Sequence, residues 1–471
     1  MTARTRWWTF AIVSLALFMA MLDNLVVVTA LPSIRRALGA SVSDLEWTVN
    51  AYTLAFAVLM MTGSALGDRF GRKRIFMIGV ATFTAGSAFS ALSGTASHLE
   101  IARALQGMGA AFLTPLTLTI LTRVFPAEQR AMVIGLWSGV SGLGLAIGPL
   151  VGGAVVNGLP WNSIFWINVP VGILVLALAY TRLDESRGLP QPLDFPGLAL
   201  AAGGLLGITF GLIRGNALGW SSATIIGSFM VGAILLAGFL VRERMARAPM
   251  LDLGLFRSVG FSAANASGFF MSAGMFGSIF FLTLYVQQVL GASPLESGLR
   301  TMPWTGTIMI VAPIAGLLAG RLGPRWIVVT GLTLQAATLF WIAQIAATTT
   351  PYNDLLLPFI LGGVGMGLSF APLAESVMGS VARAKQGQAS GAYNAIRELG
   401  GVFGVAVLGA IFQHLASNPA HFLDGFRTAL YAGTVIVAAG AIIGTLLPAR
   451  TATDVAEDAT EPIPEPIALE A

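Results

Sequence analysis

Residues 135–153 read GLWSGVSGLGLAIGPLVGG and lie inside an apolar run that is long enough to cross a membrane as a helix. Seven of these nineteen residues are glycine, although each glycine destabilises a helix in water by about 1 kcal/mol relative to alanine. Gly144, Gly148 and Gly152 lie four residues apart and form a smooth stripe that lets another helix approach closely. Pro149 lacks an N–H group, which favours a bend. The stretch therefore predicts a close helix contact, with ordinary membrane-helix packing as the alternative explanation.

The composition of the whole chain indicates a membrane protein. Of its 471 residues, 55% are hydrophobic and 10% are charged, whereas soluble proteins contain about 25% charged residues. The chain has no cysteine, so it offers neither a disulfide nor a cysteine-built metal site. Its net charge of +4 is spread over short loops, which argues against a nucleic-acid partner. We therefore expect the lipid bilayer to be its main environment.

Fourteen apolar segments along the chain are long enough to span a bilayer. We expect an all-α polytopic membrane protein with fourteen transmembrane helices. Most of the 26 Lys and Arg residues fall in cytoplasmic segments if both termini are cytoplasmic. The first run follows Arg4 and Arg6 but is too long for a signal peptide, so we expect it to be retained. The expected spans are residues 8–31, 45–66, 75–93, 99–122, 132–157, 163–181, 196–213, 222–241, 260–290, 297–320, 326–347, 354–382, 387–413 and 427–447.

Two short stretches resemble each other and indicate an internal repeat. SALGDRFGRK at residues 64–73 follows the second span, and GLLAGRLGPR at residues 316–325 follows the tenth. Their matching leucine, arginine and glycine positions share one offset, which predicts two related halves of six helices each. The tail is rich in Pro, Glu, Asp and Ala and is expected to be disordered. The predicted units are the N-terminal half (1–182), an inserted two-helix hairpin (183–258), the C-terminal half (259–450) and a cytoplasmic tail (451–471).

The loop GDRFGRKR at residues 67–74 combines two glycines with four basic residues and one acid. The glycines permit a sharp turn between two helices, and the basic residues fix the loop in the cytoplasm. Topology alone does not account for Asp68, which we expect to pair with an arginine or to interact with the N-terminus of a facing helix. The residues expected to form a cytoplasmic latch are Asp68, Arg69, Gly71, Arg72 and Arg130.

Two charged residues lie within predicted spans of the N-terminal half. Asp23 falls in the first span and Arg103 in the fourth, and a charge at membrane depth costs at least about 2.5 kcal/mol on insertion scales. We interpret both as candidates for proton coupling, because a lone carboxylate at this depth is expensive when ionised. The alternatives are a static Asp23–Arg103 ion pair and an Arg103 side chain that reaches the outer surface. Weaker candidates in the fourth span are Gln106 and Gly107.

The C-terminal half contains a second, less defined set of charges. Glu375 follows Pro372 in the span 354–382 and is a candidate for proton coupling. Arg397 and Glu398 are adjacent in the next span. They either contribute to function or simply neutralise each other near the cytoplasmic side.

The glycine-rich stretch has a spacing that resembles the fifth-helix antiporter motif of drug exporters in the major facilitator superfamily. The loop at residues 67–74 resembles that superfamily's signature between its second and third helices, although Ser64 stands where the family has its opening glycine. The resemblance implies two six-helix halves that rock about a central site, with the glycine-rich helix sealing and pivoting them. The residues that match the fifth-helix motif are Gly135, Gly144, Gly148, Pro149, Gly152 and Gly153.

Three further segments are similar to the fourteen-span drug:proton antiporters of that superfamily. Residues 99–111 resemble a fourth-helix motif in which the arginine is thought to interact with a proton-carrying acid. Residues 22–32 resemble the first-helix motif, but Leu25 and Val28 replace the usual Thr and Asn. Residues 387–409 resemble the corresponding later helix, where the neighbour of the arginine is usually Gln rather than Glu.

The sequence carries no signature of an enzyme or of a cofactor site. It contains no P-loop, dinucleotide-binding fingerprint, HExxH motif or nucleophile elbow, and its three histidines do not cluster. We expect no metal, no cofactor and no use of ATP, with a proton gradient as the energy source. The resemblance implies a monomeric, proton-coupled efflux transporter of the cell inner (plasma) membrane that exports amphipathic drugs or antibiotics. The alternatives are an exporter of one endogenous metabolite, an uptake symporter and a receptor that binds without transport.

Overall fold

The computed structural model describes residues 3–187, 194–246, 249, 251–381, 385–416 and 421–449, and the regular structure in these ranges is helical. The predicted tail, residues 451–471, lies outside the described residues. The elements in chain order are α1 (Ala3–Leu38), α2 (Val42–Phe70), α3 (Arg72–Ala91), α4 (Ala96–Val124), α5 (Ala127–Gly158), α6 (Ser163–Trp166), α7 (Asn168–Arg182), α8 (Phe195–Leu218), α9 (Ala223–Met245), the 3-10 helix η1 (Leu253–Arg257), α10 (Val259–Leu284), the π-helix η2 (Tyr285–Val289), α11 (Pro294–Leu322), α12 (Pro324–Ile345), α13 (Tyr352–Gly379), α14 (Gln386–Leu415) and α15 (Phe422–Gly444).

Fourteen helices in the described ranges are long and apolar enough to cross a membrane. Each predicted span corresponds to one of them, which confirms the all-α polytopic fold. One span consists of α6 and α7, which are interrupted at Ile167, and another continues from α10 into η2. The helices often extend beyond the apolar segment, as α1 does, because helical hydrogen bonding continues into the polar residues that flank a span.

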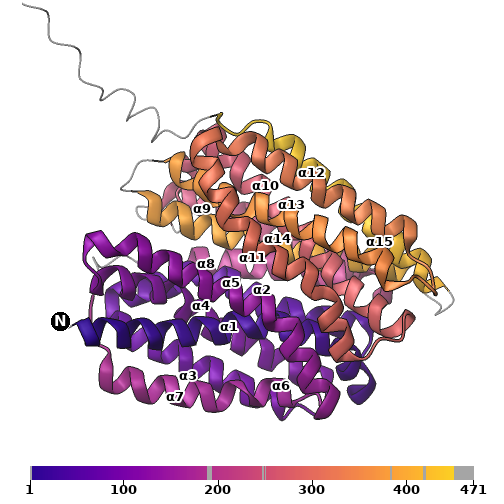
Figure 1. The fold of residues 1–471 in the computed structure, drawn as a ribbon, viewed down its shortest axis with the longest axis horizontal. Helices are drawn as coiled ribbons and strands as arrows, with labels where there is room; N and C mark the ends of the chain where they lie inside the picture. Colours follow the sequence, from indigo (N-terminus) through magenta and orange to yellow (C-terminus); the bar gives the residue numbers. More distant parts are fainter. Residues whose placement is uncertain are drawn as a thin grey trace, which may run out of the picture.

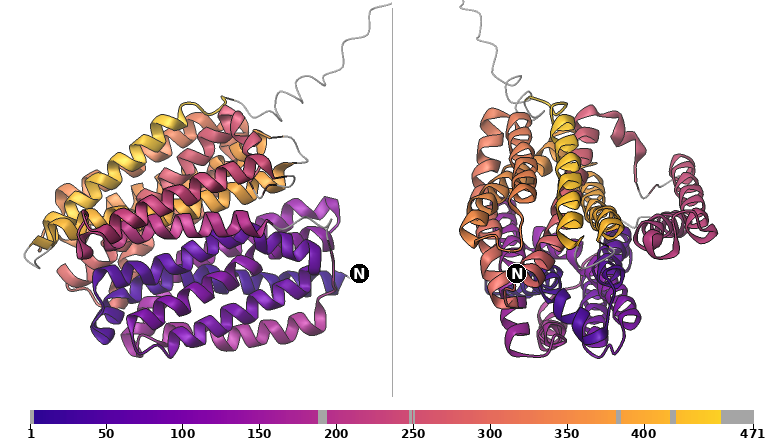
Figure 2. Two further views of the ribbon diagram at one scale, coloured as in Figure 1. Left: turned by 180° about the vertical axis from the view of Figure 1, so that it is seen from behind. Right: turned by 90° about the vertical axis from the view of Figure 1, so that its right-hand side faces the viewer.

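The spans form two bundles with a hairpin at their side (Figure 1). Helices α1–α7 pack together as one bundle, here the N-terminal half, and α10–α15 pack together as the C-terminal half. The halves meet mainly where α5 packs on α11 and where α2 packs on α14. The α8–α9 hairpin stands to the side of the bundles in the right-hand view of Figure 2, and α8 contacts both α2 and α14. The hairpin therefore lies across the joint between the halves.

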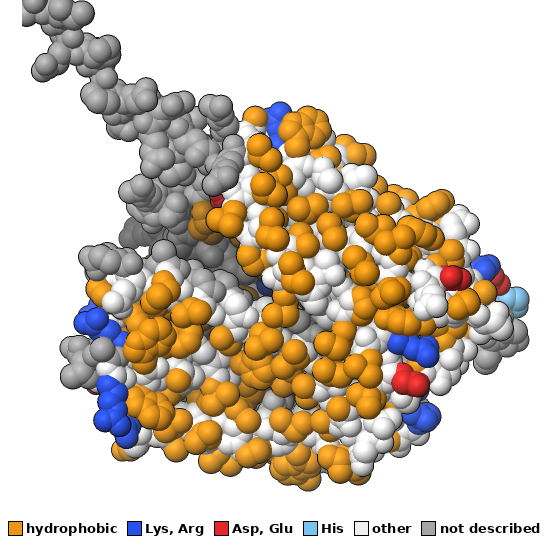
Figure 3. All heavy atoms as spheres, in the orientation of Figure 1, with side chains coloured by type: hydrophobic (Ala, Val, Ile, Leu, Met, Phe, Trp, Pro, Cys, Tyr) orange, Lys and Arg blue, Asp and Glu red, His pale blue; other side chains and the backbone are white. Residues whose placement is uncertain are grey.

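On the face drawn in Figure 3, hydrophobic side chains cover the middle, and charged side chains lie mostly toward the two ends. Large apolar side chains are widely exposed, for example Ile173, Leu317 and Val435, with exposed fractions of 58%, 75% and 69%. Soluble proteins rarely expose contiguous apolar surface of this extent. The surface therefore suits contact with the hydrocarbon interior of a bilayer.

The halves meet at one end of the molecule, which we call the closed end. There the Gln287 side-chain amide donates to the carbonyl oxygen of Thr29 at 2.8 Å, and Arg35 Nη1 donates to Gln288 Oε1 at 3.1 Å. The opposite end carries the N-terminus and the loop at residues 67–74, and we call it the basic end. In Figure 1 the two bundles diverge toward that end. The hydrogen bonds between the halves that the described residues form thus lie at the closed end.

Candidate functional site

A buried ion pair joins α1 to α4 inside the N-terminal half. Arg103 Nη1 lies 2.5 Å from Asp23 Oδ2, and the two side chains are 2% and 1% exposed. The guanidinium of Arg103 therefore does not reach the outer surface in this conformation. Burial of two charges is costly, and it is offset only where further hydrogen bonds satisfy both partners.

The carboxylate of Asp23 is bound by donors on both of its oxygens. Its Oδ2 accepts from Arg103, while Oδ1 accepts from Gln106 Nε2 and from Asn168 Nδ2, each at 2.8 Å. Ser87 Oγ accepts from the same two amides, at 3.3 Å from Gln106 and 3.0 Å from Asn168. All five side chains are buried. The network thus draws on α1, α3, α4 and α7, and it satisfies an ionised carboxylate.

Arg103 makes further contacts that depend on its planar shape. Its Nε donates to the carbonyl oxygen of Thr48 at 3.2 Å, and Nη1 also donates to Gln106 Oε1 at 2.6 Å. The guanidinium carbon lies 4.3 Å from the centre of the Tyr52 ring, which is within the range of a cation–π interaction. A lysine ammonium is a point charge and cannot reproduce this flat set of donors.

The geometry of this network allows one specific chemical exchange. A proton on Asp23 removes the charge that attracts Arg103 and leaves guanidinium donors in need of new acceptors. Asp23 therefore remains a candidate for proton coupling, and this role stays a prediction. A static ion pair is the other interpretation, and transport measurements distinguish the two.

Several members of the network were not identified from the sequence. Ser87 and Asn168 are polar residues within apolar spans, and that was the available signal for both. Tyr52 and Thr48 carried no such signal, because Tyr52 acts through its ring and Thr48 through its backbone. Gly107, a weaker candidate, has a packing role: a Cβ at this position would collide with the carbonyl oxygen of Tyr52, so α2 and α4 approach closely here.

The glycine stripe of α5 faces α1 of the same half. If a Cβ atom were added to each glycine, its nearest neighbour would be an atom of residues 21–26 of α1. The distance to that atom would be 3.0 Å for Gly144, 2.9 Å for Gly148 and 2.7 Å for Gly152. This placement corrects the prediction that the stripe lies between the halves. A spacing of four residues specifies a close neighbour but does not specify which helix supplies it.

The last part of α5 does reach the other half. Gly153 lies against the backbone of Pro294 in α11, and Gly298 of α11 lies against the carbonyl oxygen of Pro149. Each helix thus uses a glycine where it meets the backbone of the other, and this contact contributes to the closed end. Gly135 lies in the first part of α5, but its surroundings are outside the described residues.

The loop at the basic end forms contacts within the N-terminal half. Asp68 Oδ1 lies 2.7 Å from Arg72 Nη2 and also accepts from its Nε at 2.9 Å. The start of α3 is bound by Glu185, which accepts from the backbone N–H groups of Lys73 and Arg74 at 3.0 Å and 3.2 Å. The sequence left two partners open for Asp68, an arginine or a helix N-terminus; in the structure Asp68 pairs with Arg72, and Glu185 binds the N-terminus of α3.

Other residues of the predicted latch are only partly defined. Gly71 has φ 114°, a conformation that favours glycine, and a Cβ there would lie 2.7 Å from the Glu185 carboxylate. Arg69 lies over the ring of Phe70, with 5.3 Å between its guanidinium carbon and the ring centre. The side chain of Arg130 is outside the described residues. The latch therefore stays a prediction.

The C-terminal half carries an ion pair of its own. Arg397 Nη2 lies 2.7 Å from Glu398 Oε1, and its guanidinium carbon lies 4.9 Å from the centre of the Phe370 ring. These adjacent residues form an ion pair, as one of the two sequence interpretations expected. Glu375 is half-buried in α13, and its role in proton coupling stays a prediction.

A small pocket lies between the halves near the closed end. Its lining combines apolar residues of α1 with hydroxyl and aromatic side chains of α10, α11 and α13. Among the described residues, Trp304 Nε1 is buried without a hydrogen-bond partner, and the pocket holds only about 20 Å³ in this conformation, room for about one water molecule. The lining residues are Leu25, Val28, Thr29, Pro149, Ile279, Leu282, Thr283, Ser297, Thr301, Trp304, Thr305 and Phe359.

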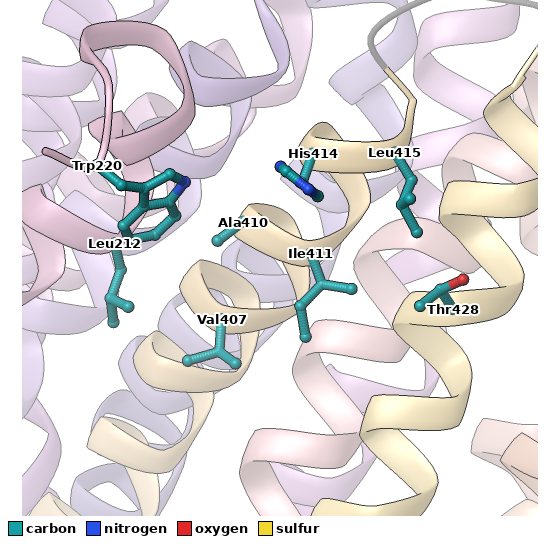
Figure 4. A pocket seen from close by; sticks show the side chains of 8 residues that line it. All are labelled: Leu212, Trp220, Val407, Ala410, Ile411, His414, Leu415 and Thr428. Carbon is teal, nitrogen blue, oxygen red and sulfur yellow. The ribbon is translucent and has the colours of Figure 1, made fainter.

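A larger groove of about 470 Å³ lies between the hairpin and the C-terminal half (Figure 4). Leu212 and Trp220 line it from the hairpin side, and Val407, Ala410 and His414 line it from α14. The groove is almost wholly apolar and contains neither Asp23 nor another acid. His414 is the one titratable side chain in its lining, and the groove lies outside the space between the halves, which is the stronger candidate site because the Asp23 network borders it.

Comparison with known proteins identifies a family. The family model described as Major Facilitator Superfamily matches residues 13–405 and, in a second match, residues 264–469. The chain is 35% identical to a Tetracenomycin C resistance and export protein of Streptomyces glaucescens, over 86% of this chain and 76% of that protein. It is 32% identical to the Multidrug efflux pump LfrA of Mycolicibacterium smegmatis, over 97% of this chain and 91% of that protein.

A solved structure has the same fold at low sequence identity. The bacterial homologue of the human lysosomal transporter Spinster, in an inward-facing and unoccupied conformation, aligns with a TM-score of 0.71 at 16% identity. The alignment covers 95% of this chain and 97% of that chain. This likeness supports the fold and carries no information about substrate.

Proposed function

The chain belongs to the Major Facilitator Superfamily, and on that premise we propose that it exports small amphipathic drugs or antibiotics in exchange for protons. It is a multi-pass membrane transporter rather than an enzyme. The observation that carries the proposal is the Asp23–Arg103 ion pair, a titratable acid buried in the interior of a half that borders the central space. The names of its relatives, an antibiotic export protein and a multidrug pump, favour export over uptake.

The proposed mechanism uses the two halves as rigid bodies. We assign the basic end to the cytoplasm, so that the structure is open to the inside and both termini are cytoplasmic. A substrate enters the space between the halves from the cytoplasm or the inner leaflet of the inner (plasma) membrane. Rocking at the α5–α11 and α2–α14 joints then closes the basic end and opens the opposite one, as in other alternating-access transporters.

Asp23 supplies the coupling in this proposal. Its ion pair with Arg103 is the state after a proton has left to the cytoplasm, in which the site accepts a substrate. In the outward-open state a proton from outside neutralises Asp23 and releases Arg103 from the ion pair. The empty transporter then returns more readily to the state that is open to the cytoplasm. The proton gradient is the only energy source in this cycle. In this proposal the protein works as a monomer and uses no cofactor.

The pocket near the closed end indicates the chemistry of the substrate. Its lining is mostly apolar, with several threonine and serine hydroxyls and the unpaired Trp304 N–H. The pocket holds only about 20 Å³ in this conformation, too little for a drug, so only the character of its lining bears on the substrate. That character suits a molecule with a broad apolar body and a few hydrogen-bond acceptors. This description fits antibiotics of the kind named for the relatives, and it fits both a multidrug exporter and a dedicated one.

Counterflow and pH-driven transport in proteoliposomes test the proposal. With an imposed pH gradient, wild type should accumulate a panel of cationic and neutral drugs, and drug addition should drive proton movement. Asp23→Asn should lose this coupled proton movement while inserting normally, because the amide resembles the acid in shape but does not take up or release a proton. Normal coupling in the variant removes Asp23 from the mechanism, and transport of only one compound favours a dedicated exporter.

A further inference from the structure

The joint between α2 and α14 encloses a carboxylate that the Asp23 network does not include. Glu46 lies in the second turn of α2 and is 0% exposed. Its Oε1 accepts a hydrogen bond from Nε2 of Gln413 in α14 at 2.7 Å. Gly409, one turn earlier in α14, makes room for the carboxylate, because a Cβ there would collide with it. Glu46 therefore lies on the contact surface between the two halves, near the closed end.

Within the described part of the chain, Glu46 has no ion-pair partner for the charge that it would carry when ionised. Among the described residues, no basic side chain forms an ion pair with Glu46, and its Oε2 is buried without a hydrogen-bond partner. Arg214 of α8 is the nearby cation, but it donates to Asp44 at 3.1 Å. Glu100 of α4 is a further titratable group near Asp44 and Arg214, and His414 of α14 lines the groove in Figure 4. A buried carboxyl group in these surroundings is much more stable as the neutral acid.

The inserted hairpin covers this part of the joint. Ser43 Oγ lies 3.1 Å from the carbonyl oxygen of Ile213 and 3.1 Å from Gln413 Oε1. Asn216 Nδ2 donates to the carbonyl oxygen of Ala410 at 2.6 Å. Helix α8 thus bridges α2 and α14 one turn from the carboxylate, and it keeps water away while this end is closed.

We propose that Glu46 is a second proton-binding site, placed on the gate that α2 and α14 form, and that closure of this gate requires its protonation. The proposal rests on the proposed function, in which the closed end faces outward and the halves separate there. On separation, Gln413 and Gly409 leave Glu46, water reaches the carboxyl group, and its proton passes to the outer solution. On closure the carboxylate takes a proton back from the same side, so this proton is bound and released but not transported.

This linkage makes the outer gate sensitive to external pH. Closure takes up one proton at Glu46, so the ratio of closed to open protein falls by up to about tenfold per pH unit once the exposed carboxyl group is ionised. Acid outside, which is the condition that drives export, therefore favours closure of the gate behind a departed substrate.

Cross-linking across the closed end tests the proposal without any substrate. The pair Arg35→Cys and Gln288→Cys replaces two side chains that meet there, in a chain that has no native cysteine. Cross-linking by a short bifunctional thiol reagent is measured in nanodiscs between about pH 5 and pH 9, in wild type and in Glu46→Gln with the same pair. Because both proteins carry the same thiols, the ratio of their yields cancels the pH dependence of the reagent.

We expect the cross-linking yield of the protein with native Glu46, divided by that of Glu46→Gln, to fall as the pH rises, by up to about tenfold per pH unit. Glu46→Met should match Glu46→Gln, because neither side chain ionises, and Asp44→Asn should match wild type. Parallel yields of wild type and both Glu46 variants over the whole range overturn the proposal. Since no drug and no gradient are present, this outcome is independent of the export assay, whose failure would instead reject the proposed function.

Discussion

The variant Gly152→Ala should destabilise the N-terminal half without opening a leak between the halves. An added Cβ would lie 2.7 Å from the carbonyl oxygen of Val26, whereas ordinary contact begins at 3.4 Å, so α1 and α5 must separate by about 0.7 Å. The atom in contact belongs to the backbone and cannot rotate away. Overpacking of this kind typically costs about 1–3 kcal/mol. At Gly148 the nearest atom is Leu25 Cβ at 2.9 Å, so the required shift is about 0.5 Å and the effect should be smaller.

Thermal unfolding of the purified protein, together with passive proton leak in liposomes, measures this effect. Gly139→Ala and Gly142→Ala are matched controls on the same helix, because an added Cβ meets nothing within 4 Å at either position. Alanine should be neutral or slightly stabilising there, as in any exposed helix position. Equal melting temperatures of Gly152→Ala and both controls would refute the packing argument. A proton leak with unchanged stability would instead mean that the stripe seals the halves in another state of the cycle.

Three further outcomes are expected. Arg103→Lys should abolish drug-driven proton movement, because an ammonium cannot supply the planar donor set; normal coupled transport by this variant would show that charge alone suffices. Asp68→Asn should shift the protein toward the state open at the basic end, since pairing of an acid with an arginine or helix N-terminus is worth about 0.3–2 kcal/mol; unchanged cross-linking of cysteines placed across that end would contradict the latch. Asp252→Asn should lower thermal stability at neutral pH, because the hydrogen bond from Lys385 lowers the pKa of Asp252. That stabilisation is present above the ordinary pKa and is lost as the pH falls through the lowered one, so a difference from wild type that grows in acid would reject it.

The fold was largely predictable because a bilayer constrains composition directly. Each span must present an apolar surface over its full length, so segments such as 222–241 are visible in the sequence alone. The ends of the helices were less well predicted: α1 extends to Leu38, whereas the predicted span stopped at residue 31. Hydropathy reports where a chain is in lipid, whereas a helix ends where its backbone hydrogen bonding ends.

The site was predictable only in part, and the reason is topological. Asp23 and Arg103 are visible because a charge at membrane depth requires an explanation, and their pairing was one of the alternatives considered. Nothing in the sequence indicates that α7 would bring Asn168 to the same carboxylate, or that α1 rather than α11 would receive the glycine stripe. Polarity and small size indicate that a partner exists, but the arrangement of helices decides which residue it is.

The two buried acids differ in what happens to them when the halves move. The donors to Asp23 come from α4 and α7, so they belong to the half that carries Asp23 and move with it. Rocking alone therefore leaves the Asp23 network intact, and a proton or a substrate arriving from the central space must change it. Glu46 is in the opposite situation, because its single donor, Gln413, belongs to the other half. Any separation at the α2–α14 joint removes that donor and admits water, so the state of Glu46 follows the motion itself. An acid inside one half is suited to respond to the cargo, and an acid at the joint is suited to respond to the gate.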